Sequence, residues 1–164
     1  LDGNLFGVDG TEALVASLFH NCSVTSLSMR RNALLADAAG CLARLLSCNA
    51  NLSHLDLSFN PLGPDGAQNL ADGLPQNGCI RRRDRRVEQP GSEVGGGLVH
   101  LAMRGCGIQQ PPIIKNGVHY LAQGLAANKY LQTLDLAANG LDGFGAQELA
   151  HALLKNKMWE GRNL

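Results

Sequence analysis

Aromatic residues, an excess of one charge and paired cysteines are all scarce or missing in this chain. Aromatics make up only 4% of the residues, which leaves little material for stacking on nucleic-acid bases. Fourteen basic and fourteen acidic residues cancel, so the net charge favours neither nucleic acid nor a membrane surface as a partner. No apolar run approaches the ~18 to 20 residues that cross a bilayer. We therefore expect no membrane partner and no nucleic-acid partner.

The five cysteines are odd in number and form no Cys-x-x-Cys pair, so the sequence indicates neither a disulfide framework nor a zinc site. Disulfides accumulate in oxidising compartments, and their expected absence favours a cytoplasmic location. Two triplets, Asn21-Cys-Ser and Asn51-Leu-Ser, match the glycosylation acceptor pattern and keep a secreted protein as an alternative, although such triplets also arise by chance.

Motifs for enzyme chemistry are also missing. The sequence has no Gly-x-x-x-x-Gly-Lys phosphate loop, no His-Glu-x-x-His, no Gly-x-Ser-x-Gly and no dinucleotide-binding fingerprint. We therefore expect a protein that is not an enzyme and that needs no cofactor.

One pattern of apolar residues around an asparagine recurs along most of the chain. Counting from Asn60, leucines lie eight, five and three positions before it and two, ten and fourteen positions after it. The pattern returns 28 and 56 positions earlier, and twice more later in the chain. The central position is occupied in turn by Asn4, Asn32, Asn60, Cys106 and Asn139.

The spacing Leu-x-x-Leu-x-Leu-x-x-Asn-x-Leu with a period near 28 resembles the leucine-rich repeats of the ribonuclease-inhibitor type. Residues 55–66 and 134–145 look especially like repeats of intracellular NOD-like receptors. The resemblance implies an α/β fold, a leucine-rich repeat solenoid in the shape of a horseshoe arc, with a parallel β-sheet on the concave face and helices on the convex face. The chain is then a single domain (1–164) of about five repeats: 1–23, 24–51, 52–79, 98–130 and 131–158.

The matching registers predict parallel strands near 25–29, 53–57, 99–103 and 132–136, each followed by a helix. The expected core is Leu27, Leu42, Leu46, Leu55, Leu57, Leu70, Leu74, Leu101, Leu121, Leu125, Leu134, Leu136, Leu149 and Leu153. Small residues near the start of each helix, such as Gly66 and Gly117, are expected to let neighbouring units approach closely. The central asparagines should form a ladder whose side-chain amides bond the backbone of each turn and of the next unit. Cys106 replaces one of them, as either an inert buried thiol or a reactive one.

The period breaks twice. Asn60 and Cys106 are 46 residues apart, which exceeds the period by 18 and places an insertion at 81–97. A second insertion of five residues lies near 109–114, and we expect the two at opposite edges of the sheet because one precedes a strand and the other follows one. The first insertion contains a cluster of arginines that suits an anionic partner, although a solvated loop or a gene-model artefact also explains it. These arginines are Arg81, Arg82, Arg83, Arg85 and Arg86.

Alternation along a strand assigns the side chains that face away from the core. If Leu55 and Leu57 point inward, the residues between them point to the concave face. Across the repeats this candidate protein-binding surface consists of Ser26, Ser28, Arg30, His54, Asp56, Ser58, His100, Arg104, Thr133 and Asp135. A solvated sheet face is the alternative interpretation, and His54, His100 and Asp56 are also possible metal ligands.

The resemblance implies a non-catalytic protein–protein interaction module, a fragment of a larger intracellular protein that acts as a monomer or as part of a longer chain. Its partner is another protein of unknown identity. The alternative is a GTPase-activating regulator similar to Ran GTPase-activating proteins, in which turns at one edge of the strands touch the GTPase. Arg31, Phe59 and the turn 60–63 would lie on that edge, although no catalytic motif of that family matches.

Overall fold

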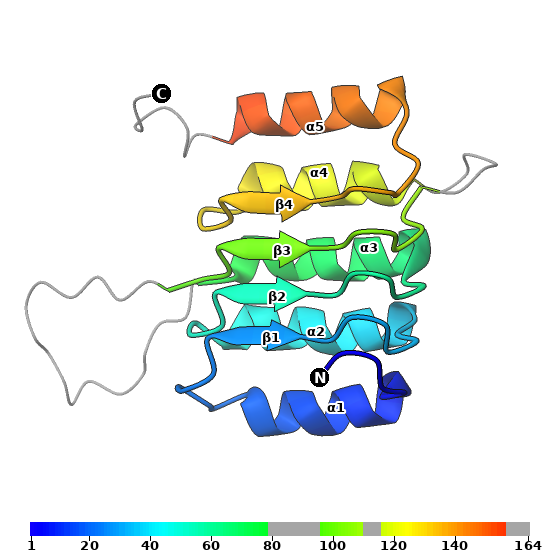
Figure 1. The fold of residues 1–164 in the computed structure, drawn as a ribbon. Helices are drawn as coiled ribbons and strands as arrows, with labels where there is room; N and C mark the ends of the chain where they lie inside the picture. The colour runs from blue at the N-terminus through cyan, green and yellow to red at the C-terminus, as the bar shows by residue number, and fades with distance from the viewer. Residues whose placement is uncertain (79–95, 110–115, 157–164) are drawn as a thin grey trace, which may run out of the picture.

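A computed structural model describes residues 1–78, 96–109 and 116–156, which form two layers (Figure 1). One layer is a parallel sheet with the strand order β1-β2-β3-β4. Its strands are β1 (Ser26–Ser28), β2 (His54–Asp56), β3 (His100–Ala102) and β4 (Thr133–Asp135). The helices cover one face of this sheet (Figure 1). They are α1 (Gly7–Leu18), α2 (Ala36–Cys48), α3 (Gly63–Gly73) with the short 3-10 turn η1 (Leu74–Gln76), α4 (Gly117–Ala127) and α5 (Gly143–Lys155).

The predicted solenoid and the register of its strands are confirmed. Leu27, Leu55, Leu101 and Leu134 are direct partners across the sheet. Each strand is one residue shorter at both ends than predicted. Backbone bonding nevertheless continues past the strands, because the N–H of Leu57 donates to the carbonyl of Ala102 at 2.8 Å.

The predicted core is largely confirmed, and its exceptions lie at the C-terminal end of the described stack. Leu134 and Leu149 are only partly buried, and Leu153 is 44% exposed, so the prediction of Leu153 as a core residue is wrong. These side chains belong to β4 and α5, which have a described neighbour on one side only. They line an open apolar pocket of about 330 Å³.

A glycine near a helix start brings neighbouring units together at Gly117, as predicted. A Cβ on Gly117 would lie 2.9 Å from the Cβ of Ala67 and 3.0 Å from the Cα of Pro64, both on α3. Real Cβ atoms do not approach their neighbours as closely as 2.9 Å, so a larger residue at Gly117 would push α4 away from α3. A Cβ on Gly66 would meet Leu62 of its own unit at 2.9 Å and would lie at ordinary contact distance, 3.5 Å, from α2.

The asparagine ladder is confirmed, except that each buried asparagine bonds the preceding unit rather than the next one. The side-chain oxygen of Asn60 accepts from the N–H groups of Asn32 at 2.7 Å and Leu34 at 3.2 Å. Its amide nitrogen donates to the carbonyls of Met29 at 2.9 Å and Leu57 at 2.7 Å. Each buried asparagine therefore bonds both its own turn and the turn of the preceding unit.

The two ends of this ladder differ in completeness. Asn139 repeats the full pattern and bonds the turn that contains Cys106. Asn4 is exposed, and its amide bonds only the carbonyls of Leu1 and Asp2 within its own unit. In the first unit the central asparagine therefore makes only the bonds within its own turn.

Cys106 takes over the donor role of the asparagine that it replaces. Its fully buried thiol donates to the carbonyl of Leu57 at 3.3 Å, the same contact that Asn60 makes to Met29 one unit earlier. Burial raises the pKa of the Cys106 thiol to about 11, which keeps the thiol protonated and able to donate. Of the two interpretations of Cys106, an inert buried thiol or a reactive one, the structure thus supports the inert thiol.

A second asparagine ladder, not expected from the sequence, runs along the ends of the helices. Asn49 donates to the carbonyls of Leu18 and Asn21 and accepts the N–H groups of Asn51 and Leu52. Equivalent buried asparagines are Asn77, Asn128 and Asn156. Each of them donates to a carbonyl at the end of the preceding unit's helix. Asn77 and Asn128 also accept N–H groups at the start of the following strand segment.

This second ladder also shows where the first insertion departs from the repeat. Asn77 accepts the N–H of Leu98, as Asn49 accepts that of Leu52 in a regular unit. The ring of Tyr130 packs on the glycines at both ends of the insertion, since a Cβ on either Gly78 or Gly97 would collide with it. The insertion therefore leaves and rejoins the stack at adjacent positions.

The second insertion starts and ends at an antiparallel bridge between Gln109 and Asn116. The residues that flank the two insertions lie at opposite ends of the strands, as expected (Figure 1). The arginine cluster at 81–86 lies outside the described residues and stays a prediction. None of the helices described here is long and apolar enough to cross a bilayer.

We expect Leu55→Ala to lower the free energy of unfolding by about 2 to 5 kcal/mol, because Leu55 is only 2% exposed at the centre of the sheet. Urea unfolding measures the change. Leu154→Ala is the matched control, since this leucine is 82% exposed and its truncation should change stability by less than about 0.5 kcal/mol. An equally small effect at Leu55 would contradict the assigned register.

We expect the buried thiol to make stability fall at alkaline pH. Above pH 9.0 the unfolded chain releases the Cys106 proton, whereas the folded chain holds it to about pH 11. The contribution of this thiol is therefore complete below pH 9.0 and is lost as the pH rises toward 11. Urea unfolding across this range should show a steeper decline for the wild type than for Cys106→Ser, and parallel declines would contradict the assignment.

Deleting residues 81–98 removes the buried Leu98 but joins Ile80 to Val99, so that Ile80 follows Asn77 by three residues as Leu52 follows Asn49. The protein should remain equally stable or become more stable, by on the order of 1 kcal/mol, because loop length enters stability only logarithmically. Limited trypsin digestion of the wild type should cut first within 81–86. A sharp drop in thermal midpoint after the deletion, together with protection of these arginines from trypsin, would instead indicate a segment packed on the solenoid.

Candidate protein-binding surface

The sheet face opposite the helices carries its polar side chains in columns. One column, aligned by the strand register, contains Ser26, His54, His100 and Thr133. A second contains Ser28, Asp56, Ala102 and Asp135. Both columns line a shallow depression of about 400 Å³ over all four strands. The structure thus brings together the seven predicted residues that lie within the strands.

His54 and His100 are direct neighbours at the centre of this face. Their rings stack with centroids 4.4 Å apart and planes at 21°. The hydroxyl of Ser53 lies 2.8 Å from Nδ1 of His54 and orients that ring. No group of three or more His, Cys, Asp or Glu side chains within the described ranges is arranged to hold a metal ion, so the metal-site alternative gains no support.

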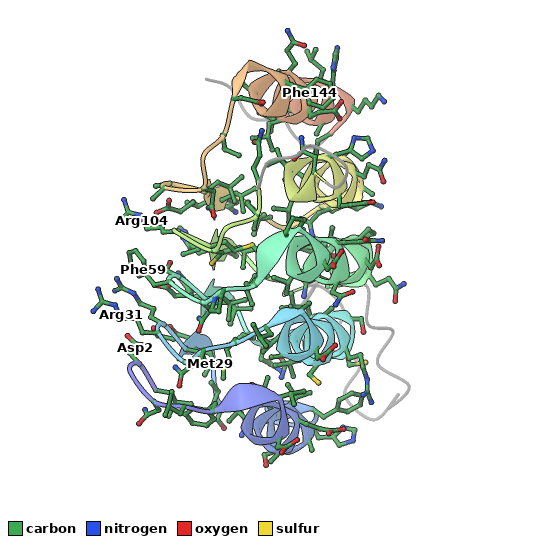
Figure 2. The ribbon with its side chains drawn as sticks, turned by 90° about the vertical axis from the view of Figure 1, so that its right-hand side faces the viewer. Asp2, Met29, Arg31, Phe59, Arg104 and Phe144 are labelled. Carbon is green, nitrogen blue, oxygen red and sulfur yellow. The ribbon has the colours of Figure 1, made fainter. Side chains whose placement is uncertain are left out.

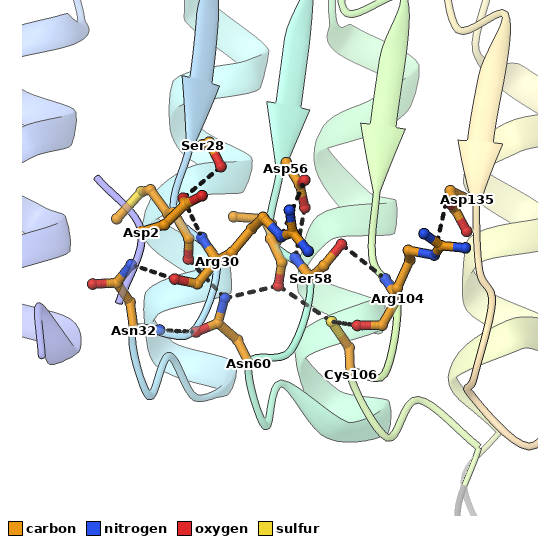
Figure 3. Close-up of polar contacts among 12 residues, drawn as sticks. Asp2, Ser28, Arg30, Asn32, Asp56, Ser58, Asn60, Arg104, Cys106 and Asp135 are labelled. Carbon is orange, nitrogen blue, oxygen red and sulfur yellow. Dashed lines mark hydrogen bonds and ion pairs between the residues drawn. The ribbon is translucent and has the colours of Figure 1, made fainter. Parts of the chain in front are cut away.

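Two arginines beyond the strand ends pair with aspartates of the following unit (Figure 3). Nε of Arg30 lies 3.7 Å from a carboxylate oxygen of Asp56, and Nε of Arg104 lies 3.2 Å from one of Asp135. All four side chains are partly exposed, and such surface pairs contribute only about 0 to 1 kcal/mol. The pairs therefore orient the guanidinium groups more than they stabilise the fold.

Ser58 does not belong to the exposed surface, contrary to prediction. It is fully buried, and its hydroxyl accepts the backbone N–H of Arg104 at 3.2 Å. The chain has already begun to turn at this position, so the side chain points along the edge toward the next unit. A short side chain with an acceptor oxygen fits there.

Asp2 has the same role two units earlier, and it was not recognised from the sequence. Its carboxylate accepts the hydroxyl of Ser28 at 2.5 Å and the backbone N–H of Arg30 at 3.0 Å (Figure 3). The Ser28 hydroxyl is the main cause that lowers the pKa of Asp2 below its ordinary value. The repeat pattern contained a signal for this role, because Asp2 precedes Asn4 by two residues, just as Ser58 precedes Asn60.

The position just before each central residue has a left-handed backbone in every unit. The residues are Gly3 (φ +72°), Arg31 (φ +53°), Phe59 (φ +61°), Gly105 (φ +59°) and Ala138 (φ +59°). The first four of these donate their N–H to a carbonyl of the following unit, so they form a backbone ladder along one edge of the sheet. We call this row the left-handed edge.

Phe59 is the large apolar side chain of the left-handed edge. It is 40% exposed, and the guanidinium groups of Arg30 and Arg31 lie 5.4 and 5.2 Å from its ring centroid. Figure 2 shows Asp2, Arg31, Phe59 and Arg104 following one another along this edge. Sequence reasoning placed Arg31 and Phe59 here but did not foresee their contact.

Comparison with known proteins finds the same repeat. A family model described as leucine-rich repeat matches residues 48–71 and 127–150. The NACHT, LRR and PYD domains-containing protein 12 of Mus musculus is 32% identical over 93% of this chain. The ribonuclease inhibitor of Sus scrofa is 29% identical, also over 93% of this chain.

The chain spans only part of these relatives, 12% of the mouse protein and 29% of the pig protein. Among solved structures, the tropomodulin C-terminal domain of Caenorhabditis elegans matches with a TM-score of 0.64 and 13% identity, covering 98% of this chain and 84% of that one. At this identity the match shows a shared fold only.

Proposed function

Because this chain is a leucine-rich repeat protein of the ribonuclease-inhibitor-like type, we propose that it is a non-catalytic module that binds another protein through the concave face of its sheet. The observation that carries the proposal is the alignment of exposed polar side chains in register over four strands. The pig relative, whose name makes it an inhibitor of ribonuclease, supports a role in binding. The surface consists of the predicted residues other than Ser58.

The geometry suits recognition because its side chains are ordered before a partner arrives. Parallel strands hold each column at a spacing of roughly 4.8 Å between units. Arg30 and Arg104 are oriented by Asp56 and Asp135, and His54 is oriented by Ser53. Side chains that are already ordered lose less conformational entropy on association, which leaves more of the contact energy for affinity.

We place this module in the cytoplasm, within a larger protein. Cys22, Cys41, Cys48 and Cys106 are all free, which agrees with a reducing compartment. The mouse relative, of which this chain matches a small part, supports the larger setting. No observation on the described residues favours the GTPase-activating alternative over binding.

We expect the double variant Arg30→Gln and Arg104→Gln to weaken a captured partner by roughly tenfold or more, because charge-assisted hydrogen bonds contribute about 1.5 to 3 kcal/mol. Glutamine avoids placing a second negative charge beside each aspartate. The partner is first isolated by affinity pull-down, and affinity is then measured by titration calorimetry.

Arg44→Gln is the matched control, because Arg44 is exposed on α2 in the helical layer. Both variants should keep the thermal midpoint within a few degrees, since surface changes stay within about 0.5 kcal/mol. Unaltered affinity in the double variant would move the binding site to an edge of the sheet or to the helical face.

A further inference from the structure

Phe59 has a left-handed backbone conformation, which is unfavourable for an L-residue, and its side chain is partly exposed to solvent. A left-handed conformation costs an L-residue roughly 1 to 2 kcal/mol, and glycine occupies the equivalent place in two other units as Gly3 and Gly105. The ring is also 40% exposed. Phe59 therefore carries a backbone cost that the glycine found at the same repeat position elsewhere does not carry.

The ring is not needed for the backbone contact made at this position. The N–H of Phe59 donates to the carbonyl of Arg104 at 2.7 Å, and the N–H groups of Gly3 and Gly105 make the same bond to the following units without a side chain. The backbone bond thus gives no reason for a phenylalanine. The ring does pack on Gly105 of the next unit, where an added Cβ would lie 3.0 Å from it, but a large part of the ring remains exposed.

The surroundings of the ring indicate what would bind there. Arg30 and Arg31 lie on the ring, and Arg30 also pairs with Asp56. Arg31 is exposed and makes no ion pair with any carboxylate of the described residues. An uncompensated guanidinium group thus lies beside exposed aromatic surface.

We propose that Phe59 and Arg31 form an anchor point for an acidic segment of the protein partner, at the left-handed edge and beside the concave columns. A partner carboxylate pairs with Arg31 through charge-assisted hydrogen bonds, and an adjacent apolar side chain covers the ring of Phe59. Aromatic residues and arginine are the types enriched at protein interfaces. The inference rests on the proposed function and names the kind of segment that the partner presents.

The test uses immobilised short peptides in which glutamate stands next to leucine, phenylalanine or tyrosine. Matched versions replace the glutamate by lysine or the apolar residue by serine. We expect the wild-type chain to bind the glutamate–apolar peptides, and Phe59→Gly and Arg31→Gln each to weaken that binding by roughly tenfold or more. The lysine and serine versions should bind as weakly as these variants do.

Two controls separate this role from a structural one. Ala138→Gly relieves the same left-handed strain on the same edge and should keep full binding, as should Arg44→Gln on α2. Circular dichroism should show Phe59→Gly folded with a thermal midpoint within a few degrees of the wild type, because relief of strain offsets the lost ring contacts.

Three outcomes would overturn the anchor. They are the absence of binding to any glutamate–apolar peptide, equal binding of the lysine versions, and unchanged binding by Phe59→Gly. If the captured partner loses affinity in the Arg30 and Arg104 double variant but not in Phe59→Gly or Arg31→Gln, the anchor fails while the concave binding face stands. If Phe59→Gly and Arg31→Gln alone lose affinity, the edge binds and the concave columns do not.

Discussion

Backbone groups in buried turns must find hydrogen-bond partners, and this requirement governs the whole stack. Each unit turns twice, once after its strand and once after its helix, and neither turn can pair its own polar groups completely. An unpaired buried group costs about 1 to 3 kcal/mol. A side-chain amide has both donor and acceptor atoms, so a buried asparagine such as Asn60 or Asn49 bonds its own unit and the preceding one. At one turn the thiol of Cys106 takes over the donor role.

The same bonds determine the surface. Because Asn60 links the backbone of its own turn to that of the preceding unit, neighbouring strands cannot slip by a residue, and every exposed side chain keeps its column. His54 therefore meets His100, and Arg30 meets Asp56. The position of the polar columns follows from bonds buried behind them.

The repeat period was enough to predict the strands, the ladder of central asparagines and most of the core, because each of these depends on what lies at the same place in neighbouring units. The prediction that Leu153 is buried was wrong because α5 has one described neighbour only, and a repeat period does not show where the stack of neighbours ends. The prediction that Ser58 is exposed was wrong because the direction of its side chain depends on where the backbone begins to turn. Strict alternation of side chains holds only inside the strand. The contact of Phe59 with two arginines depends on side-chain rotamers, which no spacing encodes.

The close approach of α3 and α4 at Gly117 has a consequence for the curvature of the inner face. Helices pack at about 8 to 10 Å, wider than the roughly 4.8 Å between strands, so the stack bends toward its sheet. Wherever a glycine lets two helices approach, this mismatch shrinks and the arc opens. A shallow arc presents its columns almost side by side, which suits a broad, gently rounded partner better than a narrow one that must be wrapped.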